Sequence, residues 1–210
     1  MIFKLDETDI AFPPPELADD DGLLAVGGDL SSARLTAAYQ QGIFPWYSDD
    51  TPILWYSPHE RFVLFPDKVK ISKSMRQVIR SGKFHLTKNK AFTSVIRECA
   101  AKARQDQDGT WITQDMQDAY GRLHNLGIAH SVEVWYQEKL VGGLYGVSAG
   151  KVFCGESMFS HASNASKLAL IWLCETQGYE LIDCQIASEH LKSLGAELIS
   201  REEYMGFLTH

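Results

Sequence analysis

Apolar residues recur with two different periods along this chain, and the two periods separate expected strands from expected helices. Short runs that alternate or stay apolar between turn residues predict strands, whereas apolar residues recurring every three or four positions predict helices. The second half of the chain shows three strand-like runs in succession, then a helix, then one more strand. We expect these strands over residues 131–137, 140–148, 151–159 and 180–186, and the helix over 164–176.

The first part of the chain differs in composition from the rest. Residues 1–60 are rich in Pro, Gly and Asp, with a helix that Ser31 or Ser32 caps and Gly42 ends. Further strands are expected over 61–65 and 84–87, and further helices over 72–81 (N-cap Ser72), 91–102, 114–126, 188–194 and 201–208. The fold class is thus α/β (α+β), with a small N-terminal α/β lobe, 1–60, and a larger mixed-sheet domain, 61–210. The order of elements in the larger domain resembles the acetyltransferase-like (GNAT) fold.

The composition is that of an ordinary folded protein. A hydrophobic share of 45% in 210 residues supports a large core, yet the longest apolar run, 168–174, is far shorter than the ~18 residues of a membrane span. The opening MIFKLDETDI is unlike a secretory signal, and the four cysteines show no CxxC spacing. We therefore expect a cytoplasmic protein, without membrane contact and monomeric.

Motifs for metals and nucleotides are missing from the sequence. The seven histidines are scattered, without an HExxH pattern or a Cys/His cluster, and neither a Walker A sequence nor GxGxxG occurs. Ser157 lacks the GxSxG context of a hydrolase nucleophile. We expect neither a metal nor a cofactor.

Charge is strongly segregated along the chain. The net charge is −7, yet residues 68–104 hold eleven Lys or Arg and one acid, for a local charge of +10, so the remainder carries −17. Four of these bases recur at spacings of three and four, on one face of the expected helix: Lys73, Arg76, Arg80 and Lys83. One basic face on an acidic protein indicates a docking surface for nucleic-acid phosphates.

Two carboxylates stand inside apolar strand patterns. Glu156 and Asp183 lie on strands that flank one expected helix, with Ser157 and Gln185 beside them. A buried charge costs several kcal/mol unless it is paired or used, so the pair indicates either hydrogen-bonded structural carboxylates or a polar site in an apolar pocket. The presence of two such residues favours the site.

Three classes of function remain open at this point. A coenzyme A-dependent N-acyltransferase would need a Q/R-x-x-G-x-G/A loop for the diphosphate after the third meander strand, but the turn FSHASNASK has no glycine. A different acyl donor, carried on nucleic acid, would instead use the basic face. Trp46 and Trp111, in loops, would offer a terminal base a stacking surface or would anchor the two lobes. A non-catalytic RNA-binding module is the third alternative.

Ten short stretches occur in order across nearly the whole chain: GLLAVGGDL, GIFPWYS, ILWYSP, GTWIT, YGRLHNLG, AHSVEVW, VGGLYGV, FCGESMFS, NASK and LIDCQ. Together they resemble the leucyl/phenylalanyl-tRNA–protein transferase family. The resemblance implies an enzyme that moves Leu or Phe, and as a further donor Met, from aminoacyl-tRNA to the N-terminal amino group of proteins beginning with Lys or Arg. That transfer marks them for degradation by the N-degron pathway.

The resemblance also implies roles for individual residues. Asp183 and Gln185 would be the catalytic pair, with Asp183 acting through Gln185 to take a proton from the incoming amine or to align it. Glu156 would hold the amino group of the donor. The other substrate-binding residues would be Trp46, Trp111, Tyr120, Leu144, Phe153, Ser157 and Leu173, and the tRNA-binding residues Lys73, Arg76, Arg80 and Lys83. Leu144 stands where the family commonly has Met, and Leu173 where it has Phe, which leaves the preference between Leu and Phe open.

Overall fold

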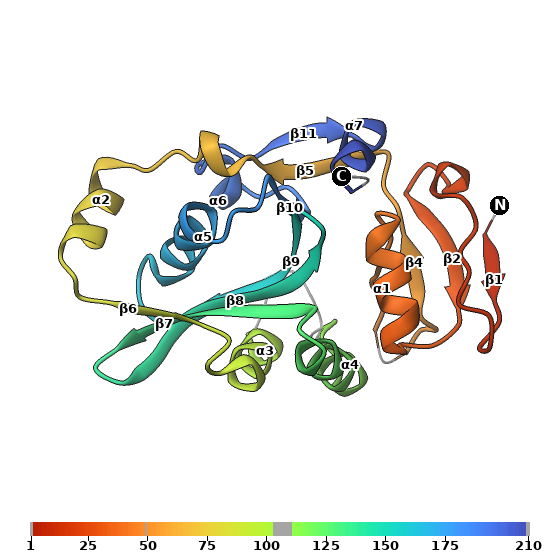
Figure 1. The fold of residues 1–210 in the computed structure, drawn as a ribbon, viewed down its shortest axis with the longest axis horizontal. Helices are drawn as coiled ribbons and strands as arrows, with labels where there is room; N and C mark the ends of the chain where they lie inside the picture. The colour runs from red at the N-terminus through yellow and green to blue at the C-terminus, as the bar shows by residue number, and fades with distance from the viewer. Residues whose placement is uncertain (1, 49, 103–110, 209–210) are drawn as a thin grey trace.

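The computed structural model describes residues 2–48, 50–102 and 111–208, and its strands form two sheets (Figure 1). The four-stranded sheet has the order β1-β2-β4-β3 and the seven-stranded sheet the order β11-β5-β10-β9-β8-β7-β6. The strands are β1 Phe3–Leu5, β2 Leu23–Gly27, β3 Phe44–Pro45, β4 Leu54–Tyr56, β5 Glu60–Leu64, β6 His85–Lys88, β7 Ala129–Tyr136, β8 Lys139–Ala149, β9 Val152–Ser160, β10 Leu181–Gln185 and β11 Glu197–Ser200. The helices are α1 Ser32–Gln40, α2 Lys73–Arg80, α3 Phe92–Ala101, α4 Gln114–Asn125, α5 Ala165–Thr176, α6 Glu189–Lys192 and α7 Arg201–Leu208, with 3-10 turns Pro15–Leu17 and Pro66–Lys68.

The predicted elements are present, with ends that differ by a few residues. Ser31 and Ser72 accept hydrogen bonds from the third residue of their helices, as expected of N-caps. Strand β11 was not expected from the sequence. The expectation that Lys83 shares a helix with the other bases is wrong, because α2 ends at Arg80 and Gly82 adopts a positive φ of 59°. Arg104 and the loop residues 105–110 lie outside the described residues.

The larger sheet is mixed, as predicted. Strands β6 to β9 pair antiparallel, β9 and β10 pair parallel, and α5 connects these last two strands. Helices α3 and α4 cover one face and α5 the other (Figure 1). On β8 a Cβ at Gly142 would lie 2.5 Å from Ala165 of α5, and one at Gly143 would lie 3.3 Å from Val95 of α3, so both helices approach the sheet closely. The larger part of the chain is thus a mixed sheet with helices on both faces.

The sheet opens between β9 and β10. The two strands pair at three positions, from Leu181 opposite Val152 to Asp183 opposite Cys154. Beyond this point β9 continues to Ser160, while β10 turns away at Gln185, which has a φ of 59° and follows a register shift against β5. The residues of β9 after Cys154 therefore face a gap instead of a neighbouring strand.

The two sheets share a hydrophobic core. One continuous cluster of buried side chains joins Leu24 and Trp55 of the smaller sheet to Tyr120, Tyr145 and Tyr204 of the larger part. A charged contact crosses the same boundary, since Arg61 Nη1 donates to the Gly42 carbonyl at 2.9 Å. The N-terminal segment is thus packed onto the larger sheet. Across the described ranges, none of the helices has the length and hydropathy needed to cross a bilayer.

Candidate functional site

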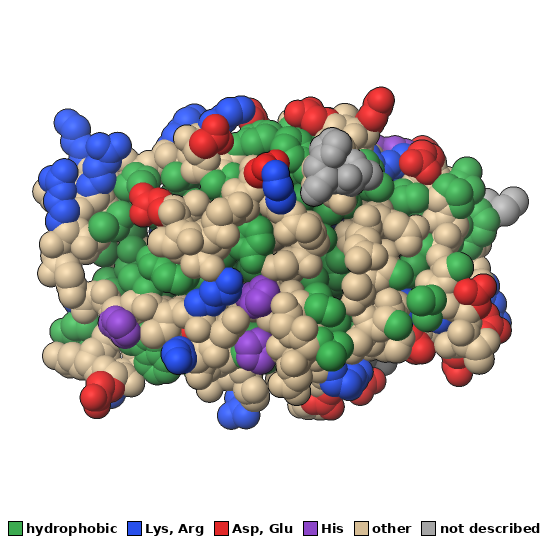
Figure 2. Space-filling view, in the orientation of Figure 1, with side chains coloured by type: hydrophobic (Ala, Val, Ile, Leu, Met, Phe, Trp, Pro, Cys, Tyr) green, Lys and Arg blue, Asp and Glu red, His purple; other side chains and the backbone are tan. Residues whose placement is uncertain are grey.

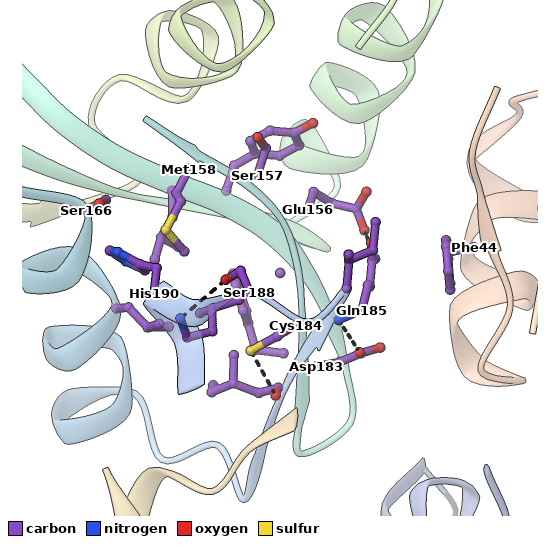
Figure 3. Close-up of a pocket in the computed structure, with 18 of the residues that line it drawn as sticks. Phe44, Glu156, Ser157, Met158, Ser166, Asp183, Cys184, Gln185, Ser188 and His190 are labelled. Atoms are coloured by element: carbon purple, nitrogen blue, oxygen red, sulfur yellow. Dashed lines mark hydrogen bonds between the residues drawn. The ribbon is translucent and has the colours of Figure 1, made fainter. Parts of the chain in front are cut away.

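A cavity of about 570 Å³ occupies the gap between β9 and β10 (Figure 3). Strand β9 contributes residues from Phe153 to Met158, β10 and the turn after it contribute residues from Ile182 to Ser188, and β3 closes one side with Phe44. The full lining is Phe44, Pro45, Trp46, Lys102, Trp111, Leu144, Tyr145, Phe153, Gly155, Glu156, Ser157, Met158, Ser166, Leu170, Ile182, Asp183, Cys184, Gln185, Ile186, Ser188, His190 and Leu191. The cavity thus lies along the edge of β9 that β10 no longer pairs with.

Glu156 is the most strongly hydrogen-bonded acid of the cavity. Its Oε1 accepts from the Tyr39 hydroxyl at 2.7 Å and from Gln185 Nε2 at 2.9 Å, and its Oε2 accepts from the Tyr120 hydroxyl at 3.2 Å. The Tyr39 and Tyr120 hydroxyls are also in contact with each other, but a hydroxyl that donates to Glu156 has no second proton to donate to its neighbour. A carboxylate has about four acceptor positions, so three bonds leave room for one further donor from the cavity.

Burial of Glu156 changes its acidity. The side chain is 7% exposed, and burial raises its pKa from 4.5 to about 7, although the hydrogen bonds from Tyr39, Gln185 and Tyr120 act to lower it. Burial also raises the pKa of both tyrosines, which keeps them protonated as donors. Glu156 can therefore exchange a proton, or bind a cation, near neutral pH.

Gln185 connects the two carboxylates of the site. Its main-chain N–H donates to Asp183 Oδ1 at 2.9 Å, and its side-chain Nε2 donates to Glu156. Its positive φ is uncommon for a residue with a side chain and costs of order 1–3 kcal/mol, which surrounding contacts must offset. The bend turns the Gln185 side chain toward Glu156 (Figure 3).

Asp183 is completely buried and is ion-paired to Arg61 of β5. Burial by itself would lower the pKa of Arg61, but the charge and hydrogen bond of Asp183, together with Tyr204 and Cys154, outweigh burial and raise it. The Arg61 guanidinium also lies 4.3 Å from the ring centroid of Tyr204 on α7. Arg61 thus fixes the position of the Asp183 carboxylate, which lines the cavity.

The wall between these polar groups and the far end of the cavity is apolar. Leu144, Phe153, Leu170 and Ile182 line it. A Cβ at Gly146 would lie 2.7 Å from the Phe153 ring, so this glycine allows the ring its position. The structure places Leu173, an expected wall residue, outside the lining: it is 1% exposed and belongs to a hydrophobic core cluster.

The other expected substrate-binding residues surround the cavity. Trp46, at the edge of β3, and Trp111 both line it, as does Ser157. Tyr120 lies behind Glu156 and reaches the cavity through that hydrogen bond. The structure therefore brings together residues from the small sheet, from α4 and from the split strands.

The basic residues lie apart from the cavity. Lys73, Arg76 and Arg80 on α2 and Lys83 after it are exposed, and Figure 2 shows blue side chains gathered over α2. Helix α5 separates them from the cavity, since its Ser166 and Leu170 line the cavity, whereas its Leu168 and Ile171 line a second, smaller cavity together with Val78 and Ile79 of α2. The basic side chains therefore lie on the other side of α5 from the site.

Sequence reasoning missed three residues that support the site: Tyr39, Arg61 and Tyr204. Arg61 carries the same sequence signal that identified Asp183, a charge beside an apolar strand. The roles of Tyr39 and Tyr204 depend on contacts with distant residues, which no local pattern reports. Among the described residues, no group of three or more His, Cys, Asp or Glu side chains could hold a metal ion.

Comparison with known proteins gives a consistent result. The family model described as "Leucyl/phenylalanyl-tRNA protein transferase" matches residues 63–209, and the model of that family's N-terminal domain matches residues 28–59. A leucyl/phenylalanyl-tRNA–protein transferase from Syntrophobacter fumaroxidans is 54% identical over 99% of this chain and 89% of its own length. One from Syntrophus aciditrophicus is 56% identical over 95% and 84%.

Among solved structures, a GCN5-related N-acetyltransferase from Kribbella flavida aligns with a TM-score of 0.40 and 10% identity, over 76% of this chain and 57% of that one. The sequence relationship is far closer, and two family models together cover most of the chain. The chain belongs to the leucyl/phenylalanyl-tRNA–protein transferase family of aminoacyltransferases.

Proposed function

We propose that this enzyme transfers Leu or Phe, with Met as a further donor, from aminoacyl-tRNA to the α-amino group of proteins that begin with Lys or Arg. The product would carry a new N-terminal residue that directs it to degradation by the N-degron pathway. One observation carries the proposal: an apolar cavity that ends in the hydrogen-bonded series Glu156, Gln185 and Asp183, in a chain of this family.

The donor side chain would occupy the apolar wall formed by Leu144, Phe153, Leu170 and Ile182. A side chain that branches at Cγ places its bulk deep along such a wall, whereas Val and Ile place it at Cβ. Shape alone would then discriminate against β-branched donors by ~1–3 kcal/mol. Because Leu173 does not line the cavity, its side chain would affect the donor preference only indirectly, through the packing of the core.

The donor's amino group would bind Glu156. The remaining acceptor position of this carboxylate faces the cavity, and an ammonium there would restore the charge balance of a buried acid. Trp46 and Trp111 would hold the terminal adenosine by stacking. The donor would thus be held by its amino group and by its adenosine, with the reactive ester between these two contacts.

The chemical step joins an amine to an ester that is already activated. The nitrogen of the acceptor forms a bond to the ester carbonyl carbon, the bond from that carbon to the ribose oxygen breaks, and a proton lost by the nitrogen ends on the ribose hydroxyl. The enzyme mainly positions the reactants and stabilises charge. No covalent enzyme intermediate is needed.

Asp183 and Gln185 would divide this work. The ion pair with Arg61 holds the Asp183 carboxylate in place, and this carboxylate would stabilise the nitrogen that becomes positive during attack. Gln185 Nε2 is committed to Glu156, which leaves Gln185 Oε1 to accept from the amine and align it. The Asp183 bond to the Gln185 main chain holds that orientation.

The body of the tRNA would lie on α2. Lys73, Arg76 and Arg80 are exposed there, and phosphate contacts of this kind give affinity without reading sequence. Lys83 would contribute from the segment after the helix.

Transfer of radiolabelled leucine from leucyl-tRNA to a peptide beginning with Arg tests the proposal. We expect transfer that ribonuclease abolishes, and none to the same peptide with an acetylated N-terminus. Gln185→Ala should lower the transfer rate by about 10²-fold or more, whereas the exposed Gln40→Ala on α1 should leave it unchanged. Binding of tRNA without transfer would indicate an RNA-binding module, and a thermal shift with acetyl-coenzyme A would indicate the acyltransferase alternative.

A further inference from the structure

The end of the cavity opposite Glu156 carries a second polar group of side chains. Ser166, Ser188, His190 and Lys102 line the cavity there, and Figure 3 shows Ser166, Ser188 and His190 on one side of the view with Glu156, Gln185 and Phe44 on the other. Lys167, in the first turn of α5, is tied to this end because its Nζ donates to Ser193 Oγ at 3.3 Å, which in turn donates to the His190 carbonyl at 2.6 Å. We call Lys102, Lys167 and His190 the basic rim.

The basic rim has positive charge that nearby acids do not neutralise. Lys102 Nζ donates to the Met158 carbonyl at 3.4 Å, a neutral partner. Two acids on the adjoining helices already have basic partners, Glu98 with His161 and Glu189 with Lys192. Within the described part of the chain, the ion pairs include neither Lys102 nor Lys167.

His190 is available to a ligand at this rim. Its Nε2 is buried and has no hydrogen-bond partner among the described residues. Burial lowers the pKa of His190, and the charges of Lys167 and Lys102 lower it further, so all three groups lie close enough to influence one another. A bound anion would satisfy the histidine nitrogen and both ammonium groups together.

The position of Lys167 links the cavity to the basic helix. At about 3.6 residues per turn, Lys167 falls between the face of α5 that turns Ser166 and Leu170 to the cavity and the face that turns Leu168 and Ile171 to α2. A chain of phosphates leaving the cavity at this end would pass Lys167 on its way to α2. The opposite end of the cavity carries Glu156 and Asp183, and these two carboxylates would repel the phosphates.

We propose that Lys102, Lys167 and His190 bind a phosphodiester of the single-stranded 3′ end of the donor tRNA, next to the terminal aminoacyl-adenosine. This inference rests on the proposed function. The rim would contact the nucleic-acid backbone. This contact is separate from the stacking of adenosine on Trp46 and Trp111 and from the binding of the tRNA body by α2. The ligand of the rim is the RNA phosphate and not the diphosphate of coenzyme A.

A donor without phosphodiesters and a short donor with two of them test the inference. Leucyl-adenosine has no phosphodiester, whereas the leucyl trinucleotide ending in CCA has two, and neither is long enough to depend on a tRNA body. We expect the variant with both Lys102→Ala and Lys167→Ala to lose tenfold or more in kcat/KM with the trinucleotide and to keep the wild-type value with leucyl-adenosine. Lys139→Ala, an exposed lysine on β8, is the matched control and should change neither value.

The salt dependence and competition give independent readouts. The double variant should show a shallower dependence of trinucleotide KM on salt than the wild type, because fewer counterions are released. Unacylated CCA should compete with the donor, and coenzyme A should compete no better than inorganic phosphate. Stronger competition by coenzyme A would overturn the assignment to RNA phosphate.

Two further results would overturn the inference. An equal loss with both donors would place the rim's effect on the amino acid or adenosine, and no loss with either would show that no phosphate contact exists. If the wild-type enzyme transfers leucine from neither donor nor from intact leucyl-tRNA, the proposed function itself fails. If the wild-type enzyme transfers leucine and the double variant does so equally well, only the proposed phosphate contact fails.

Discussion

Removing the charge of Glu156 should change how the stability of the protein depends on pH. The folded protein holds the Glu156 proton up to about pH 7, whereas the unfolded chain releases it near its ordinary pKa of 4.5. Between these two values the folded state binds more protons than the unfolded state, so stability falls as pH rises through this window and levels off above pH 7. The difference between the two pKa values corresponds to about 3 kcal/mol.

The variant Glu156→Gln cannot titrate at this position. Its free energy of unfolding should therefore lack the loss of about 3 kcal/mol between pH 4.5 and pH 7 that the wild type shows. The measurement is urea unfolding of both proteins at several pH values from 5 to 8. Other titrating groups cancel in the difference between the two proteins, which isolates Glu156.

Glu16→Gln serves as control, because it makes the same substitution at an exposed position. Its stability curve should run parallel to that of the wild type. If the Glu156→Gln curve were also parallel to the wild type over this pH range, the reasoning that burial dominates the environment of Glu156 would be refuted.

Three further predictions concern other parts of the site. Arg61→Met should destabilise the protein by about 3–5 kcal/mol, measured by chemical unfolding, because it leaves Asp183 charged and unpaired in the interior; a loss below 1 kcal/mol would contradict the buried ion pair. Gly146→Ala should destabilise, since its Cβ would lie 2.2 Å from the Cys154 carbonyl, whereas Gly121→Ala within α4 meets nothing within 4 Å and should stabilise by ~0.5–1 kcal/mol in the same assay. Arg80→Ala should weaken binding of all tRNAs in gel shift and reduce the salt slope by about 1, and an unchanged slope would exclude a phosphate contact.

The sequence allowed prediction of those features that depend on local pattern. The meander, the long helix α5 and the strand β10 followed from apolar periodicity, and Glu156 and Asp183 stood out because a charge in an apolar run requires a partner. The motifs then identified the family. The N-terminal lobe and the larger domain, 1–60 and 61–210, stay a proposal, because the two share one hydrophobic core.

The features that escaped prediction depend on long-range contacts. Strand β11 has four residues, of which one, Ile199, is buried, so its apolar pattern is weak, and it forms through pairing with β5. The contact of Arg61 with Asp183 joins residues 122 positions apart, which no local pattern reports. The exclusion of Leu173 from the cavity depends on how α5 is rotated against the sheet.

The strand order of the larger sheet has a consequence for synthesis on the ribosome. Strand β5, which carries Arg61, pairs on one side with β10 and on the other with β11, so it emerges long before either neighbour exists. Until then Arg61 has Gly42 but neither Asp183 nor Tyr204 as a partner. A nascent chain that ends before β10 would hold Glu156 with its two tyrosines but lack Asp183 and Gln185, so the active centre is completed only near the end of synthesis.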